Sequence, residues 1–155
     1  MRSVLIDTNI LLLLIVGMYD KQLIEQHKRT NTFVIEDYDL LIEYIEQYQT
    51  WWVTSHSLAE VSNLLRQAHK QQRKGLMVCF SDLCTALKES HIGKHALFRD
   101  DLYIRLGVTD TGIVLKAKRV SCVLTVDLDL YNELLQRGYY AENFNHLRER
   151  HLYSG

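Results

Sequence analysis

The hydrophobic positions near the N-terminus predict a buried strand followed directly by a helix. Ser3 to Ile6 form a short, mostly apolar run that ends on Asp7. The apolar segment from Ile10 to Met18 follows almost at once. It is too short for a membrane-spanning helix, and Asp7 interrupts it on the N-terminal side. We therefore expect a core helix, and we expect that the protein has no membrane partner. This beginning indicates an α/β protein.

Apolar residues at helical spacing predict further helices in the middle of the chain. The stripe of residues 40, 41, 44, 45 and 48 predicts a second helix, and residues 51–55 (WWVTS) predict a short strand. A third helix is expected over residues 57–72 and a fourth over residues 76–90, with Gly75 as the break between them. Residues 91–107 are expected to form helical pieces, and the stretch from Lys21 to Asp39 looks like an added segment.

The C-terminal third returns to the alternation of strands and helices. It predicts a helix starting near Asp110, a buried strand from Cys122 to Val126, a helix closed by Gly138, and one more short strand within residues 139–147. Such alternation predicts a parallel sheet with helices on both faces, whose functional edge lies at the carboxyl ends of the strands. We expect one domain over residues 1–155.

Charge and cysteine content narrow the class of protein. The 155 residues include 18 basic and 19 acidic side chains, for a formal charge of -1, so any polyanion must be met by a local patch. Cys79, Cys84 and Cys122 form an odd set without C-x-x-C spacing. This pattern suits unpaired thiols in a reducing compartment, and we expect a cytoplasmic protein.

Four carboxylates stand at turns beside the predicted strands and helices. Asp7, Asp110 and Asp127 each precede a helical segment and would serve as helix N-caps, and Ser57-x-x-Glu60 matches a capping box. Gathered at one edge, however, the four acids would repel one another unless a cation held them. Oxygen ligands alone select a hard ion, Mg²⁺ or Mn²⁺.

The segments VLIDTN, SLAEVSNLL, LGVTDTGIVLKAKR and VLTVDLDL together resemble the four acidic motifs of PIN-domain nucleases, in the same order and with similar spacing. The resemblance runs from about Ser3 to Phe144. It implies a PIN-like three-layer α/β/α sandwich with a central parallel sheet of about five strands. It also implies a metal-dependent endoribonuclease. The residues that would carry its site are the metal ligands Asp7, Asp110 and Asp127, the fourth acid Glu60, and the polar helpers Asn9 and Thr125. Asp129 would be either an accessory carboxylate or a helix N-cap.

The chemistry implied by this resemblance is phosphodiester hydrolysis, in which a metal lowers the pKa of a bound water and the product carries a 5′-phosphate. No motif in the chain indicates an activated Ser or Cys nucleophile. Free-standing PIN domains of this size are frequently toxins of bacterial toxin–antitoxin pairs. The resemblance therefore also implies an RNA substrate, an antitoxin protein as partner, and a homodimer.

Two basic stretches are candidates for RNA phosphate contact. The first is the run RQAHKQQRK, which supplies Arg66, Lys70, Arg73 and Lys74 together with His69 and contains no acid. A solvated helix end explains it equally well. The second is the group Lys116, Lys118 and Arg119, which is plain surface if it faces away from the functional edge.

Other functions fit the sequence less well. A phosphatase of the haloacid dehalogenase type needs a second Asp two residues after the first, where this chain has Asn9. A PIN-like module that binds RNA or protein without cleavage would not need four carboxylates opposite a phosphate backbone. His91 and His95 have the spacing of zinc ligands on a helix, but Gly93 lies between them and no third ligand motif accompanies them. Trp51 and Trp52 are expected in the core.

Overall fold

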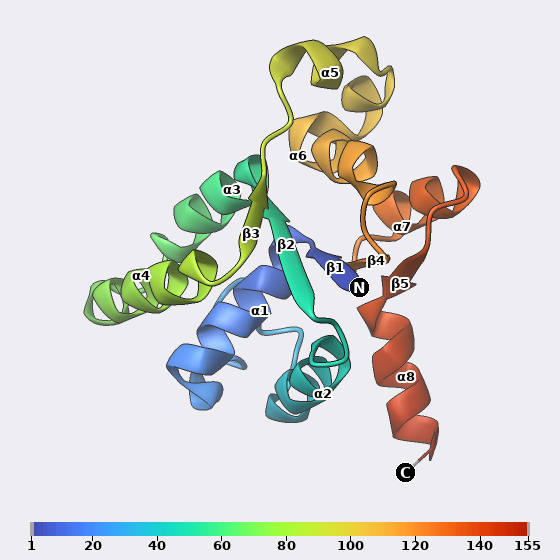
Figure 1. Cartoon of the computed structure of the whole chain (residues 1–155). Coiled ribbons are helices and arrows are strands. Elements are labelled where there is room, and N and C mark those ends of the chain that lie inside the picture. The colour runs from blue at the N-terminus through green and yellow to red at the C-terminus, as the bar shows by residue number, and fades with distance from the viewer. Residues whose placement is uncertain (1, 155) are drawn as a thin grey trace.

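The computed structural model describes residues 2–154, which form an all-parallel five-stranded sheet with helices on both faces (Figure 1). The strand order across the sheet is β3-β2-β1-β4-β5. The strands are β1 (Ser3–Ile6), β2 (Thr50–Thr54), β3 (Lys88–Ser90), β4 (Cys122–Thr125) and β5 (Ala141–Asn143). The predicted fold class, a three-layer α/β/α sandwich around about five parallel strands, is confirmed.

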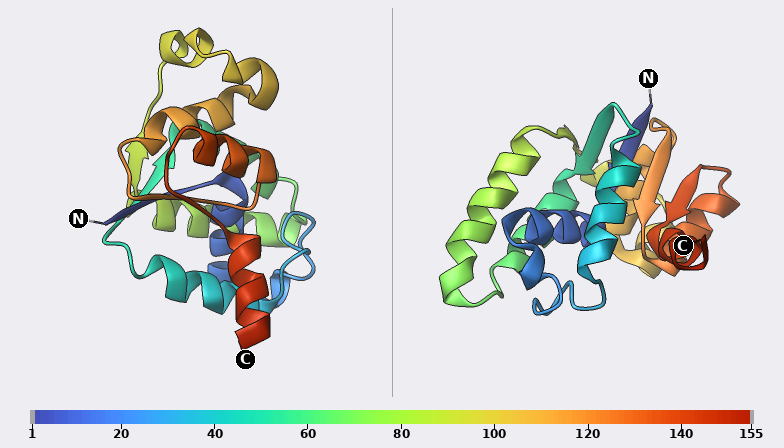
Figure 2. Two further views of the ribbon diagram at one scale, coloured as in Figure 1. Left: turned by 90° about the vertical axis from the view of Figure 1, so that its right-hand side faces the viewer. Right: turned by 90° about the horizontal axis from the view of Figure 1, so that it is seen from below.

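The helices fall into two layers, seen from two further sides in Figure 2. In chain order they are α1 (Thr8–Tyr19), the 3₁₀ turn η1 (Lys21–Leu23), α2 (Ile35–Ile45), α3 (Ser55–Leu65), α4 (Lys70–Thr85), α5 (Lys94–Arg99), α6 (Leu102–Ala117), α7 (Leu128–Gln136) and α8 (Phe144–Ser154). One apolar cluster joins α1 with α2, α3 and α4, and a second joins the sheet with α6 and α7. Within residues 2–154, no helix has the length and apolar character needed to cross a membrane.

The helix α1 is the centre of the larger layer. Its residues from Ile10 to Val16 are all at most 1% exposed, because α2, α3 and α4 cover the sides of α1 that the sheet leaves open. The predicted core helix is therefore confirmed, although Met18 at its end is 47% exposed. The three cysteines are unpaired, as expected.

The middle of the chain differs from the prediction in two places. The helix expected over residues 57–72 is interrupted after Leu65, and α4 begins only at Lys70. Gly75 does not break a helix but lies inside α4, where its missing side chain leaves room for the ring of Tyr19. Residues 88–90, expected to be helical, form β3. The sequence gives little sign of this three-residue edge strand, because it has no apolar alternation.

The C-terminal third agrees better with the prediction. The helix expected near Asp110 is the second half of α6, which begins after a kink at Gly107, where φ is +85°. A residue without Cβ adopts this conformation without strain. The strand β4, the helix α7 and the strand β5 lie where they were predicted, and Gly138 follows the end of α7. The helix α8 was not predicted.

Close packing between α1 and α2 yields a stability prediction. A Cβ added at Gly17 would lie 2.1 Å from Cδ2 of Tyr38, a ring that is 8% exposed and cannot move aside easily. We expect Gly17→Ala to lower the free energy of unfolding by about 1–2 kcal/mol, because overpacking outweighs the higher helix propensity of Ala. Urea unfolding followed by circular dichroism measures this. The matched control is Gly93→Ala, where no atom lies within 4 Å of the added Cβ; equal losses in both variants would contradict the packing argument.

Candidate metal centre

The order of the strands creates a natural site at the carboxyl edge of the sheet. The chain moves from β1 to β2 and β3 on one side, and then returns to place β4 on the other side of β1. In open parallel sheets, a crevice forms at the carboxyl ends of the strands where the order reverses in this way. Asp7 directly follows β1, and Asp127 comes two residues after the end of β4. Both carboxylates therefore belong to the reversal point.

The hydroxyl of Thr125 connects these two acids. Thr125 is fully buried at the end of β4 and donates a hydrogen bond of 2.6 Å to Oδ2 of Asp7. The same hydroxyl oxygen accepts a 2.9 Å hydrogen bond from the backbone N–H of Asp127. Asp127 in turn caps α7, since its Oδ1 accepts from the N–H of Leu130 at 3.0 Å. The predicted N-cap role of Asp127 is thus confirmed, and Thr125 holds the loop that carries it.

Asp7 is the most enclosed acid of the group, with 4% of its surface exposed. Its Oδ1 accepts from the N–H of Thr8 at 2.7 Å, so it also caps α1 as predicted. Burial raises the pKa of Asp7 to about 6, although the hydrogen bonds from Thr125 and Thr8 lower it. The negative charges of Asp127 and Glu60 raise the pKa of Asp7 further.

Asp110 approaches the same edge from the opposite layer. It lies in the first turn of the half of α6 that begins after Gly107, and a hydrogen bond of 2.7 Å from Thr111 to the Gly107 carbonyl holds that turn. Burial raises the pKa of Asp110 to about 7. The charges of the neighbouring acids, led by Asp7 and Asp127, add to this effect.

Glu60 reaches the site from α3, but not in the way that the sequence suggested. The N-cap of α3 is Thr54, whose hydroxyl accepts from the N–H of Ser57 at 3.1 Å. The predicted capping box of Ser57 and Glu60 is therefore wrong, because the helix begins earlier and Glu60 lies in its second turn. Glu60 is exposed, and its charge acts on both Asp7 and Asp110.

Buried hydroxyl groups fix α3 beside α1. Thr8 donates to Oγ of Ser57 at 3.3 Å, and Thr54 donates to the same oxygen at 3.1 Å. The sequence analysis did not single out Thr8, and it treated Ser57 only as a helix cap. Their signal was the cluster of Ser and Thr at a strand-to-helix turn, a position where hydroxyls bind backbone groups.

The two remaining predicted site residues lie at the margin. Asn9 is exposed in the first turn of α1, and its side chain forms no hydrogen bond within residues 2–154. Asp129 is exposed in the first turn of α7, where its charge raises the pKa of Asp110. It is not the N-cap of α7, because Asp127 occupies that position.

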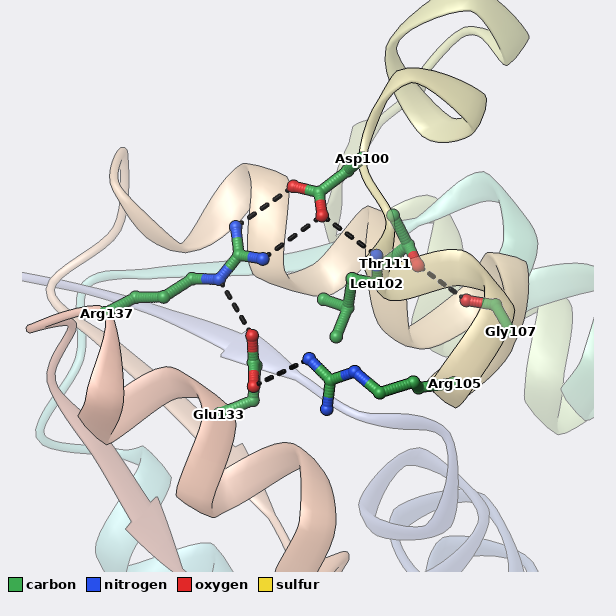
Figure 3. Close-up of polar contacts among 7 residues, drawn as sticks. All are labelled: Asp100, Leu102, Arg105, Gly107, Thr111, Glu133 and Arg137. Atoms are coloured by element: carbon green, nitrogen blue, oxygen red, sulfur yellow. Dashed lines mark hydrogen bonds and ion pairs between the residues drawn. The ribbon is translucent and has the colours of Figure 1, made fainter.

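A network of ion pairs holds α6 against α7 (Figure 3). Arg137 binds Asp100 through two hydrogen bonds of 3.0 and 3.1 Å, and its Nε binds Glu133 at 3.0 Å. Glu133 also accepts from Arg105 at 3.3 Å. These pairs join the start of α6 to the body of α7, so that Asp110 and Asp127 keep their relative positions.

The acids of the site have no basic partner. Among residues 2–154, no Lys, Arg or His forms an ion pair with Asp7, Glu60, Asp110 or Asp127. Their oxygen atoms are the ligands that a hard divalent cation prefers. Within the same residues, however, no three acidic, His or Cys side chains stand together as a ready ligand set. The donors therefore fit such a cation in chemistry, and side-chain movement would be needed to close them around it.

The predicted basic run lies away from this edge. Arg66 caps the C-terminus of α3, and Lys70, Arg73 and Lys74 belong to the first turns of α4. The hydroxyl contact of Thr8 with Ser57 joins the N-termini of α1 and α3, so the run lies at their other end.

His91 and His95, whose spacing is that of zinc ligands on a helix, do not share a helix. His91 precedes α5, and His95 lies within it. His91 instead stacks on His56 with ring centroids 6.1 Å apart, and its Nδ1 lies 3.3 Å from Oγ of Ser55.

The role of Thr125 can be tested by two substitutions. Thr125→Val removes the donor to Asp7 and the acceptor for the Asp127 N–H, and we expect a loss of about 2–3 kcal/mol in the free energy of unfolding. Thr125→Ser keeps the hydroxyl and should cost about 1 kcal/mol for the lost methyl group. Urea unfolding measures both. A Val variant as stable as the parent would show that the hydroxyl contributes nothing.

The raised pKa values predict how stability depends on pH without metal. Because folded Asp7 and Asp110 bind protons more tightly than the unfolded chain, stability should fall by several kcal/mol as pH rises from about 4 to about 8. Asp110→Asn should flatten this dependence and be more stable than the parent near the upper limit. Added Mg²⁺ or Mn²⁺ should restore the parent.

Unfolding in urea with excess chelator, and then with metal, checks this expectation. The control variant is Asp82→Asn, on the exposed side of α4 and outside the group of acids. If the parent protein instead became more stable as pH rises over this range, the conclusion that the acidic group is unpaired would be wrong.

Comparisons with known protein families and with curated proteins identify no relative of this chain. No model of a known protein family matches it. A search of curated proteins likewise finds no significant match. The function proposed below therefore depends on the residues and on the motifs that they form.

Proposed function

We propose that this protein is a metal-dependent endoribonuclease of the PIN type that hydrolyses RNA phosphodiester bonds with Mg²⁺ or Mn²⁺. One observation carries the proposal. Asp7, Glu60, Asp110 and Asp127 come from four separate helices or their caps, and none has a basic partner among residues 2–154. The charges of Glu60 and Asp127 act on both Asp7 and Asp110 at the reversal point of the sheet. Their order along the chain is that of the four PIN motifs.

Each residue has a definite task in this proposal. Asp7, Asp110 and Asp127 hold the cation, and Glu60 is the fourth acid. Thr125 orients Asp7 through its 2.6 Å hydrogen bond, and Asp129 adds negative charge at the margin. Asn9 is available to contact substrate, because its side chain is exposed. A bound Mg²⁺ or Mn²⁺ would supply a water of lowered pKa and stabilise charge on the leaving oxygen.

The reaction is the attack of water on phosphorus with loss of the 3′ oxygen. The bond from phosphorus to O3′ breaks, the water oxygen stays on phosphorus, and the products carry a 5′-phosphate and a 3′-hydroxyl. The proton released by the water can pass to a carboxylate of the site. No side chain of the chain needs to form a covalent intermediate.

The geometry favours this function over the alternatives. A pure RNA-binding surface would not gather unpaired carboxylates opposite a phosphate backbone. A phosphatase of the haloacid dehalogenase type would need a carboxyl group at the position of Asn9.

The same resemblance supports a biological setting. In this proposal the protein acts in the cytoplasm, forms a homodimer, and is the toxin of a toxin–antitoxin pair that an antitoxin protein holds inactive.

The proposal is tested by RNA cleavage. Purified protein is incubated with labelled single-stranded RNA in Mg²⁺, in Mn²⁺, or in excess chelator, beside the variants Asp7→Asn and Asp127→Asn. We expect metal-dependent cleavage that leaves a 5′-phosphate and falls by about a hundredfold or more in each variant, because a carboxylate ligand is lost. Circular dichroism confirms that each variant is folded.

Asp82→Asn is the matched control, since it removes one carboxylate from the exposed side of α4. Cleavage that survives both site substitutions, or that leaves a 5′-hydroxyl, would come from a contaminating enzyme. If folded parent protein binds metal but leaves several kinds of RNA intact, the nuclease proposal fails in favour of a binding module.

A further inference from the structure

A second polar feature lies beside the acidic site, at the β3 edge of the sheet. It is a cavity of about 270 Å³ between the end of β3 and the C-terminal half of α6. Its polar lining consists of Ser90 and His91 from one side and Lys116, Lys118 and Arg119 from the other. Lys116, Lys118 and Arg119 are the second basic group identified in the sequence. In the structure, the imidazole of His91 and the hydroxyl of Ser90 join this group around the cavity, which we call the α6 pocket.

The positive charges of the α6 pocket are not neutralised. No acidic side chain lines the pocket, and none of its three cationic residues forms an ion pair within residues 2–154. The nearest acid along β3, Glu89, accepts a 2.9 Å hydrogen bond from Ser55. Because neighbouring residues of a strand face opposite sides, Glu89 and Ser90 point to different layers. The pocket therefore keeps a net positive charge that an anion would satisfy.

Contacts with Trp52 fix part of this charge in place. The ammonium group of Lys116 lies 3.6 Å from the centroid of the Trp52 ring, and that of Lys88 lies 5.7 Å from it. Lys116 is only 9% exposed, and burial lowers its pKa. Since these two cations already approach the ring, Trp52 is poorly placed to stack on a nucleobase. The pocket is suited to phosphate groups and not to base recognition.

The α6 pocket lies close to the acidic site. Ser90 ends β3 and His91 follows it at the carboxyl edge of the sheet, two strands from β1, which corresponds to about 10 Å. Lys116 follows Asp110 by six residues on α6, which corresponds to about 9 Å along the helix axis. One extended nucleic-acid strand can therefore contact both places.

We propose that the α6 pocket binds the phosphodiester backbone of the RNA strand whose neighbouring bond lies at the acidic site. This inference rests on the proposed function for its choice of RNA as ligand. His91, Lys118 and Arg119 contact phosphate oxygens, and Lys116 contributes charge from its position on Trp52. The contact is independent of sequence, because phosphates carry no base information.

The basic run at residues 66–74 is the natural comparison. It carries one cation more than the α6 pocket, but none of Arg66, Lys70, Arg73 and Lys74 lines the cavity beside it. The cations of that cavity are Lys28 and Arg29 of the Lys21–Asp39 segment. The run also lies at the end of α3 away from Thr8 and Asp7. The inference assigns the main phosphate contact to the α6 pocket.

The test measures RNA binding separately from cleavage. Binding of a short fluorescein-labelled single-stranded RNA is followed by anisotropy in excess chelator over a range of salt concentrations. The pocket variant is Lys118→Gln with Arg119→Gln, and the matched control is Lys70→Gln with Arg73→Gln. We expect the pocket variant to bind about tenfold more weakly, and the slope of log K against log salt to fall by about 1.4, which is about 0.7 for each lost contact to a single strand. The control should change neither quantity by a comparable amount.

Several results would overturn the inference: unchanged binding in the pocket variant, a loss at least as large in the control, or no RNA binding by the parent. Displacement of RNA by inorganic phosphate at equal concentration would show a site for free phosphate instead. Equal binding of poly-glutamate would indicate an acidic protein partner. If the parent binds RNA through the pocket but cleaves none in any metal, the inference stands and the proposed nuclease function fails. In an active protein, the pocket variant should raise KM and leave kcat unchanged.

Discussion

The hydrogen bonds of the Thr125 hydroxyl are the constraint on which the site depends. They join the end of β1 to the loop after β4, because the hydroxyl donates to Asp7 and accepts from the backbone of Asp127. Each of these acids also caps a helix, so the same residues that repel one another are needed to start α1 and α7. A structural task and a chemical task therefore coincide in Asp7 and Asp127. This coincidence explains how the fold holds two carboxylates close together.

The sequence predicted the positions of residues best where a clear strand pattern could be combined with the rule that parallel strands end at one edge of the sheet. A buried strand that ends on an acid was visible at Asp7 and at Asp127, and the parallel arrangement of the strands required both acids to share one edge. The local structure expected around Glu60 was wrong, because Thr54 competes with Ser57 for the N-cap and the serine–glutamate spacing alone cannot decide between them. The strand β3 was missed, since three exposed or half-buried residues at a sheet edge carry no periodic signal. Its position follows only from pairing with β2.

The polar residues of the molecule fall into groups with opposite electrostatic character. Arg137, Glu133, Asp100 and Arg105 form a closed network in which each charge has a partner, and the pKa of Asp100 is lowered by its hydrogen bonds from Arg137. The acids around Asp7 have none, and burial raises the pKa of both Asp7 and Asp110. The paired network stabilises the contact of α6 with α7, while the unpaired acids oppose it. In the proposed function, a bound cation would remove this opposition, because it would neutralise the unpaired acids.

Two groups of opposite charge without ion pairs lie on neighbouring parts of the sheet and of α6. Unpaired acids lie at the reversal point between β1 and β4, and unpaired cations line the pocket beyond β2 at the β3 edge. The helix α6 belongs to both, because Asp110 lies near its kink at Gly107 and Lys116 lies near its end. A metal at the first place and a phosphate backbone at the second would each remove a local excess of charge. An RNA strand that reaches from the α6 pocket to a metal ion at the acids would satisfy both, whereas a cation alone would leave the α6 pocket positive. The formal net charge of -1 does not reveal this separation, because it is a sum over all acidic and basic residues of the chain.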